Sequence, residues 1–168
     1  MTMVKVRDPG SIPSGVMLGP PDWTIGRHTY RWEAPDVLWV TLEGDNTLED
    51  ALEMVNLYKA LGEQRPYFVL ADSAAAGAME LEARHHLSEH MRPEWFRGII
   101  FYNARLLHRA MARGLIIAAE LFHAAPEASV MRERLHFVST QAQACALLDQ
   151  LRAHGSDVKG QPSRMTLS

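Results

Sequence analysis

Hydrophobic and polar residues alternate near the start of the chain in the pattern of a β-hairpin. Between residues 27 and 33 the aromatic side chains of Tyr30 and Trp32 stand two positions apart, with polar residues around them. The stretch 34–36 reads Ala-Pro-Asp, which is typical of a turn, and the run 37–42 after it is almost entirely apolar. The pattern predicts two strands joined by a turn.

The residues that follow have the period of an amphipathic helix. From Leu48 to Leu61, apolar side chains recur three or four positions apart, which places them on one helical face. Asn46 or Thr47 can cap the helix, because Glu49 or Asp50 follows three positions later, as in a capping box. Gly62 is expected to end the helix.

Further apolar runs of strand length alternate with helical patterns along the rest of the chain. The predicted elements are a strand at 67–71, a loop at 72–78, a helix at 80–91, a strand at 96–102, a long helix at 104–122, a strand at 135–138, and a last helix that Ser139 or Thr140 opens and Gly155 closes. Strands that alternate with helices predict right-handed crossovers and parallel pairing. The predicted fold class is α/β, with a mixed, mostly parallel sheet, an N-terminal hairpin and the order ββαβαβαβα.

The two ends of the chain differ from this region. Residues 1–21 are rich in Pro and Gly, so we expect an N-terminal arm without regular structure. Residues 156–168 are polar and are expected to form a disordered tail. Residues 22–155 lie between them and are predicted to form one domain, which suits a length of 168 residues.

Composition narrows the functional classes. The formal net charge of −3 gives no reason to expect a nucleic-acid partner, because such domains are usually strongly basic. A single cysteine, Cys145, excludes an intrachain disulfide framework and fits a reducing compartment. Cys145 stands among apolar residues of the last predicted helix, so we expect a small core side chain rather than a nucleophile. No stretch is long and apolar enough to span a membrane, and the expected location is cytoplasmic.

The order of elements resembles a known family. The segment 37–44, the helix 47–62, the strand 65–72 that ends in Asp72, and the strand 97–101 are together similar to the SpoIIAA-like branch of the STAS fold, which is related in shape to the SEC14 lipid-exchange domain. The resemblance covers about residues 27–154. It implies a STAS-like domain that acts without catalysis, through protein contacts.

The resemblance also implies where a regulatory serine would stand. The best-known members are anti-anti-sigma factors, switched by phosphorylation of a serine about nine residues after the aspartate that ends the strand. In this chain the matching places hold Glu80 and Leu81, and Ser73 is nearer to Asp72 and is expected to bond its local backbone. We therefore expect a regulatory domain without the phospho-acceptor, or alternatively a SEC14-like binder of a lipid or small apolar ligand.

Histidines are the first candidates for metal chemistry. Glu82, His86 and His90 recur every four residues on the second predicted helix, and two imidazoles with a carboxylate can bind zinc. The same residues suit a solvated helix face, and the spacing fixes no further ligand. We expect no metal, no cofactor and no catalytic residue; an enzyme would have to use this row or Asp72.

Two further features are candidate binding sites. Arg105, Arg109 and Arg113 form a basic stripe on the third predicted helix, which is also rich in apolar residues. Such a helix suits a protein partner, a second copy of the chain in a homodimer, or anionic lipid head groups. Asp72 stands at the carboxyl end of a central strand, where open α/β sheets bind ligands, although it can also cap its own turn.

Overall fold

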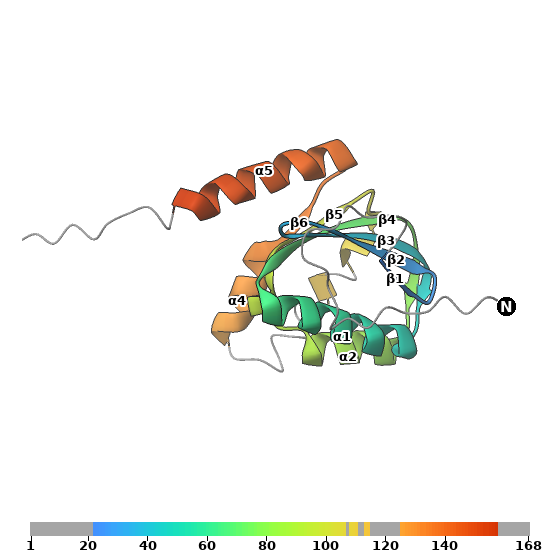
Figure 1. Ribbon diagram of the computed structural model, residues 1–168. Coiled ribbons are helices and arrows are strands. Elements are labelled where there is room, and N and C mark those ends of the chain that lie inside the picture. Colours follow the sequence, from blue (N-terminus) through green and yellow to red (C-terminus); the bar gives the residue numbers. More distant parts are fainter. Residues whose placement is uncertain (1–21, 107, 111–112, 115–124, 158–168) are drawn as a thin grey trace, which may run out of the picture.

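The computed structural model describes residues 22–106, 108–110, 113–114 and 125–157 (Figure 1). The predicted arm, 1–21, and residues 158–168 of the predicted tail lie outside these residues. Most of the second half of the predicted helix 104–122 also lies outside them.

The described residues form one six-stranded sheet whose strands follow one another in chain order. The strands are β1 (Trp23–Ile25), β2 (His28–Glu33), β3 (Val37–Asn46), β4 (Tyr67–Met79), β5 (Phe96–Tyr102) and β6 (Leu135–Phe137). The pairs β1–β2 and β2–β3 are antiparallel, whereas β3–β4, β4–β5 and β5–β6 are parallel. The predicted α/β class, the mostly parallel sheet and the N-terminal hairpin are confirmed.

Helices cover both faces of this sheet. They are α1 (Leu48–Gln64), α2 (Leu81–His90), the 3-10 turn η1 (Pro93–Trp95), α4 (Ala125–Arg134) and α5 (Gln141–Asp157), and the described residues between 106 and 114 are helical as well. Figure 1 shows α1, α2 and α4 on one face of the sheet and α5 on the other. No helix among the described residues is long and apolar enough to cross a membrane.

Two apolar cores follow from the alternation of side chains along the strands. Leu38, Val40 and Val69 point to the face that α1 and α2 cover, where they pack with Tyr58 and Phe96. On the other face, a second core packs against α5 and consists of Val37, Phe68, Leu70, Ile100, Tyr102, Ala144 and Leu148. The run that begins at Tyr67 is apolar throughout because this strand is buried on both faces.

A capping box fixes the start of α1. The Thr47 hydroxyl accepts from the backbone N–H of Asp50 at 3.2 Å, and the Asp50 carboxylate accepts from the backbone N–H of Thr47 at 3.1 Å. The predicted end of this helix is wrong, since α1 continues past Gly62 to Gln64. Gly62 has a packing role instead: a Cβ at this position would lie 2.5 Å from side-chain atoms of Trp95.

The segment predicted as a loop at 72–78 is strand, because β4 runs on to Met79. Its small side chains show no alternation of apolar and polar residues, so the pattern did not reveal the strand. This extension of β4 pairs in parallel with the carboxyl-terminal half of β3. The pairing register shifts twice, between Thr41 and Glu43 and between Gly44 and Asn46. The Asp45 carboxylate accepts from the backbone N–H of Ala78 at 2.8 Å and helps to hold this extension.

The structure adds three elements to the predicted order: the short strand β1, the 3-10 turn η1 and the helix α4. It also corrects the end of the last helix, because α5 passes through Gly155 to Asp157. The N-terminal side of α5 agrees with the prediction: the Thr140 hydroxyl accepts from the backbone N–H of Gln143 at 3.2 Å.

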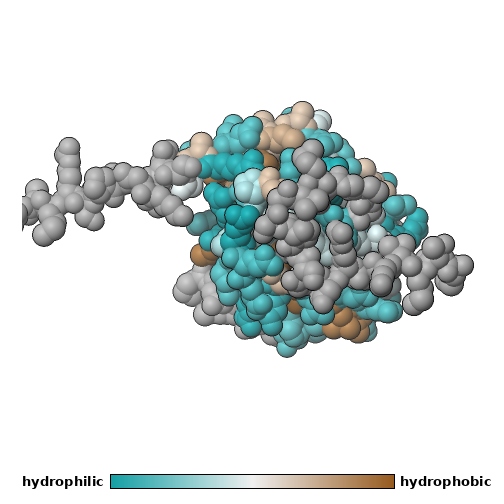
Figure 2. Space-filling model, in the orientation of Figure 1, coloured by the Kyte–Doolittle hydropathy of each residue, from teal (hydrophilic) through white to brown (hydrophobic). Residues whose placement is uncertain are grey.

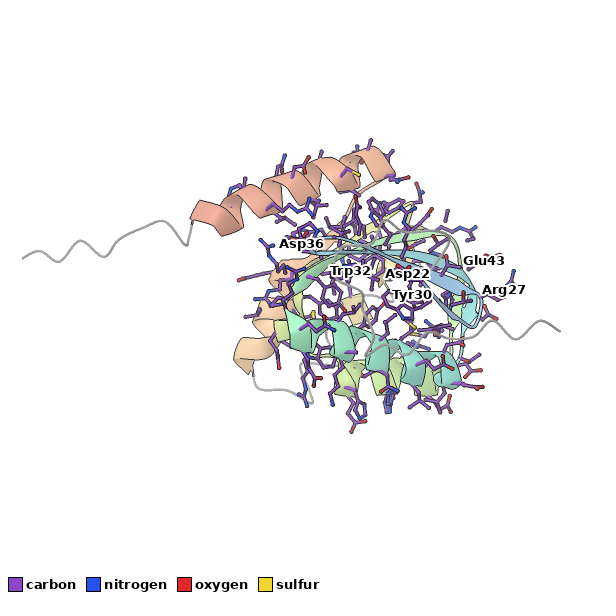
Figure 3. The ribbon with its side chains drawn as sticks, viewed as in Figure 1. Asp22, Arg27, Tyr30, Trp32, Asp36 and Glu43 are labelled. Carbon is purple, nitrogen blue, oxygen red and sulfur yellow. The ribbon has the colours of Figure 1, made fainter. Side chains whose placement is uncertain are left out.

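An ion-pair cluster anchors α5 to the sheet. Asp36, in the turn just before β3, is 7% exposed, and its carboxylate accepts from Arg97 of β5 at 2.8 Å and from Arg152 of α5. Figure 3 shows Asp36 at one end of the sheet, with Arg27 and Glu43 at the opposite, carboxyl end of β3. The ion-pair cluster thus lies at the amino end of β3. The candidate site lies at the opposite end of the sheet, where the parallel strands have their carboxyl ends.

Candidate ligand-binding site

A cavity of about 80 Å³ lies at the carboxyl ends of the parallel strands. Its walls come from β2 to β6 and from the helical segment that begins after Ala104, and most of the lining side chains are apolar, among them Leu42, Met79, Phe101 and Phe137. Roughly 10–15 Å³ is enough for one water, so this volume holds a small organic group. Open α/β sheets commonly bind ligands at this edge.

Strand alternation decides which side chains reach the cavity. On β3, Leu42, Gly44 and Asn46 share the face of the sheet that α1 and α2 cover, and His28 of β2 lies beside them. Ser73 of β4, which is 1% exposed, extends the same face. Ser73 was expected in a loop, and this placement is wrong because residue 73 belongs to the extended part of β4.

His28 is a buried polar group on the cavity wall. It is 1% exposed, and its Nδ1 accepts from the backbone N–H of Glu43 at 3.0 Å. Burial lowers the pKa of the imidazole below its ordinary value of 6.5, and Arg27 lowers it further, whereas Asp50 and Glu43 act in the opposite direction. The ring is therefore neutral at pH 7, and its buried Nε2 has no hydrogen-bond partner among the described residues.

Asn46 is a second buried polar group in the cavity. It is 6% exposed and ends β3, where its backbone carbonyl accepts from the N–H of Glu80 at 3.0 Å. The side-chain amide donates from Nδ2 to the sulfur of Met54 at 3.3 Å. Its Oδ1 is buried and has no partner in the part of the chain that the structure describes. Buried polar atoms are nearly always paired in native proteins, so these two need an explanation.

The helical segment above the cavity contributes His108. This side chain is half-buried and lines the cavity, and its Nδ1 is buried without a partner among the residues described. Whether Nδ1 of His108 is a donor or an acceptor depends on the tautomer of the ring. Three polar side chains with unpaired buried atoms thus line one small, mainly apolar cavity.

Asp72 does not belong to this cavity. Its neighbour Ser73 lines the cavity, so Asp72 points to the opposite face of the sheet, beside Tyr102. Its Oδ1 accepts from the backbone N–H of Ala74 at 3.0 Å and from Nδ2 of Asn103 at 3.2 Å. Burial raises the pKa of Tyr102 to about 12, and the nearby Asp72 carboxylate adds to that rise. These bonds agree with the local, turn-like interpretation of Asp72.

The three arginines of the basic stripe lie outside the cavity in different environments. Arg105 and Arg113 are exposed, whereas Arg109 is half-buried. The guanidinium carbon of Arg113 is 5.7 Å from the ring centroid of Phe137, which forms part of the cavity wall. The apolar residues 115–122 of the predicted helix lie outside the described residues, so the binding surface on this helix stays a prediction.

The histidine row of α2 forms a local stack. The rings of His86 and His90 have centroids 4.1 Å apart and are inclined by 24°, and Nδ1 of His90 lies 3.0 Å from the carbonyl oxygen of His86. Glu82 is exposed. Over the residues that the structure describes, no group of three or more His, Cys, Asp or Glu side chains is placed to hold a metal ion. Cys145 is half-buried and carries a free thiol.

Glu80, at one of the positions matched to the regulatory serine, has a structural contact. Its carboxylate accepts from the backbone N–H of Leu48 at 3.0 Å, in the first turn of α1. An acidic group there also complements the dipole of the helix. Leu81, the next residue, is 62% exposed.

Comparison with known proteins gives a structural similarity but no sequence match. No family model and no curated protein sequence matches the chain. Among solved structures, it is similar to the anti-sigma factor antagonist SpoIIAA in its unphosphorylated form, with 9% sequence identity and a TM-score of 0.48 over 74% of this chain and 97% of that chain. The similarity that the sequence predicts is thus also found in the structure. What the cavity can bind depends on its own residues.

The sequence pattern does not single out His28 or Asn46 as residues of a binding site. The prominent histidines were those of α2, whereas His28 stands alone in a strand. Its signal was the alternation itself, since His28 lies two positions before Tyr30 and therefore on the same buried face. Asn46 was considered only as a possible helix cap, a role that Thr47 takes instead.

Proposed function

We propose that this chain is a non-catalytic binding domain that takes a small, mainly apolar molecule, or the end of a longer one, in the cavity at the carboxyl edge of its sheet. The observation that supports this function is a mainly apolar cavity with a few polar residues, among them His28, Asn46 and His108, in its lining. Ligand sites commonly combine an apolar lining with a few polar groups that orient the ligand.

The size of the cavity limits the ligand. A dry apolar cavity of about 150 Å³ binds benzene or xenon in another protein, so about 80 Å³ suits a smaller group. A longer molecule would place only one end there. This agrees with the alternative that the sequence suggests, a binder of a small apolar ligand or lipid.

His28 would supply a neutral polar group to this site. Burial disfavours the imidazolium, so the ring remains a neutral hydrogen-bonding group near neutral pH. In this role the ring would help to orient a ligand.

A regulatory role through protein contacts is the second candidate. Leu48, Leu52 and Leu81 are 37%, 43% and 62% exposed, and the bond from the Leu48 N–H to the Glu80 carboxylate brings the starts of α1 and α2 together. Figure 2 shows an apolar patch at the lower right, over the ends at which these helices begin. Exposed apolar patches of this kind suit protein contacts. Self-association and a specific partner both stay predictions.

Xenon binding tests the proposed ligand site with an apolar probe. The wild-type protein, labelled at its methionine methyl groups, should show saturable chemical-shift changes at Met79 as the xenon pressure rises. Ala76→Ile adds bulk on the cavity wall and should remove these changes, because Ala76 lines the cavity on β4. Ala75→Ile is the matched control, since Ala75 is its exposed neighbour on the opposite face of the same strand.

Two results would contradict the ligand site. One is a wild-type protein that gives no saturable shift at Met79. The other is a pair of variants, Ala76→Ile and Ala75→Ile, that respond to xenon equally while both retain the wild-type circular dichroism spectrum.

A further inference from the structure

The carboxyl end of β3 extends beyond its backbone pairing with β2. The last residue of β3 that pairs with β2 in the described sheet is Thr41, whereas β3 continues to Asn46. On its other side, the pairing of this end with β4 shifts register twice, and Gly44 has a positive φ of 72°. The same end contributes Leu42, Gly44 and Asn46 to the cavity. One wall of the cavity therefore belongs to an irregular piece of strand.

Two side-chain contacts to Glu43 connect this end of β3 to the start of β2. The Nδ1 atom of His28 accepts from the backbone N–H of Glu43 at 3.0 Å, and the Arg27 guanidinium donates to the Glu43 carboxylate at 3.1 Å. His28 is 1% exposed, whereas the side chains of Arg27 and Glu43 are 70% and 50% exposed, so solvent screens their ion pair. The bond to His28 is therefore the main one of the two contacts.

The direction of this bond decides where an added proton would bind. The backbone N–H of Glu43 can only donate, so Nδ1 of the neutral His28 ring holds the lone pair and Nε2 carries the hydrogen. A further proton can bind only at Nδ1, because this is the one ring nitrogen with a lone pair. Two N–H groups would then face each other across 3.0 Å. Protonation of His28 and its bond to Glu43 thus exclude each other.

The groups around the ring set the pH range in which this conflict arises. Burial lowers the pKa of His28 below 6.5 and Arg27 of its own turn lowers it further, whereas Asp50 of α1 and Glu43 of β3 raise it. From the helical segment, His108 lines the same cavity, and the described lining contains no Asp, Glu, Lys or Arg. A released, solvated ring regains its ordinary pKa, so the released state binds the proton first and gains population as the pH falls below 6.5.

We propose that His28 and Glu43 form a latch that proton binding opens. The protonated ring releases the backbone of Glu43, the carboxyl end of β3 moves away from β2, and the cavity loses part of its wall. A ligand is then held near neutral pH and released at acidic pH. The release of ligand rests on the proposed function, because it concerns the same cavity, whereas the movement of β3 does not.

An NMR titration of the wild-type protein tests the latch without any ligand. The nitrogen chemical shifts of the His28 ring report protonation at Nδ1, and the amide proton shift of Glu43 reports its hydrogen bond. Both should change with one midpoint, below pH 6.5, while the amide signals of residues 37–41 keep their native shifts. A Glu43 amide shift that stays constant while His28 binds a proton overturns the latch. A ring that stays neutral until the whole domain unfolds also overturns it.

Two variants assign the effect to His28. Asn carries Oδ1 as many bonds from the backbone as Nδ1 of His, so His28→Asn keeps an acceptor for the Glu43 N–H but cannot bind the proton. Its Glu43 amide shift should stay constant between about pH 7 and about pH 5. His108→Asn removes the other histidine of the cavity and should respond like the wild type. Equal responses of the wild type and His28→Asn would assign the effect to other groups and overturn the latch. If His28→Asn does not fold, the wild-type titration decides.

Xenon binding, measured at Met79 over the same pH range, tests the release of ligand. Because only the latched form keeps the cavity wall complete, the apparent affinity of the wild type should be about twofold weaker at the midpoint of the His28 titration and should fall further below it. His28→Asn should bind xenon equally across this range, and His108→Asn should follow the wild type. Xenon binding that ignores pH while the latch opens overturns the release but leaves the apolar site standing. A wild-type protein that binds no xenon at any pH overturns the proposed function, and with it the release.

Discussion

Replacing Asp36 with Asn should loosen the attachment of α5 to the sheet. The Asp36 carboxylate joins Arg97 of β5, at 2.8 Å, to Arg152 of α5. Asn has nearly the same shape but no charge, so the variant leaves two guanidinium groups around a neutral amide. Arg97 also lies over the ring of Phe68, with 4.6 Å between the guanidinium carbon and the centroid, and this contact should hold it in place. The loss should therefore concentrate on Arg152 and α5.

The expected magnitude follows from the exposure of the three side chains. A hydrogen bond to a charged group contributes about 1.5–3 kcal/mol when buried, whereas an exposed ion pair contributes at most about 1 kcal/mol. The Asp36 side chain is 10% exposed, but those of Arg97 and Arg152 are each 36% exposed, so solvent screens part of both interactions. About 1 kcal/mol for each pair gives a decrease of about 2 kcal/mol in the free energy of unfolding.

Urea unfolding and amide hydrogen exchange measure this effect. Asp36→Asn should lower the unfolding free energy by about 2 kcal/mol and should reduce the protection of α5 more than that of α1. In a double-mutant cycle with Arg152→Gln, the coupling should be about 1 kcal/mol. Asp149→Asn, an exposed change on the same helix, is the control. A loss no larger than that of the control, or exchange that rises equally in α1 and α5, would refute the role of Asp36 as the anchor of α5.

Three further changes test other parts of the structure. Gly62→Ala should lower the unfolding free energy by about 1–3 kcal/mol in urea titrations, although alanine favours helices, because the new Cβ would lie 2.5 Å from side-chain atoms of Trp95; an unchanged midpoint would contradict this close contact. The folded state holds the pKa of His28 below its ordinary 6.5, so the unfolded chain binds the proton first, and the unfolding free energy should fall as the pH drops below 6.5. His28→Gln should make that fall shallower in urea titrations between about pH 7 and about pH 5, and an unaltered slope would show that other groups produce it. The double change His86→Ala and His90→Ala should shift the unfolding free energy by no more than about 0.5 kcal/mol, as for other surface changes, whereas a loss of several kcal/mol together with loss of bound zinc would support a metal site.

The elements with strong periodic patterns were predictable, and those set by packing were not. The helix after β3 is clear in the sequence because its apolar face has the helical period and Thr47 supplies a cap. Its end was mistaken because the role of Gly62 depends on Trp95, a residue distant in sequence. The extension of β4 was missed since its pairing with the end of β3 has no signature in a run of Ala, Ser and Gly.

The residues of the candidate site were even less predictable from the sequence than the elements set by packing. The carboxyl edge of the sheet was predicted as a place for a site, but through Asp72, which the structure places on the opposite face from the cavity. Neighbouring residues of a strand point to opposite faces of the sheet, so Ser73 lines the cavity and Asp72 does not. Which of the two faces the cavity depends on the register of the sheet. The unpaired atoms of His28 and Asn46 are defined by their bonds to Glu43 and Met54. Such bonds form only after the chain folds, so no sequence pattern reports them.

Diffraction from a xenon-derivatised crystal tests the ligand site most directly, because it locates the probe. The structure predicts a xenon atom bounded by Phe101, Phe137 and Met79, at the carboxyl end of the sheet. It also predicts that the same site is absent from Ala76→Ile crystals and present in Ala75→Ile crystals. Well-diffracting crystals of the wild-type protein with no xenon between these three side chains would contradict the existence of an apolar ligand site at this edge.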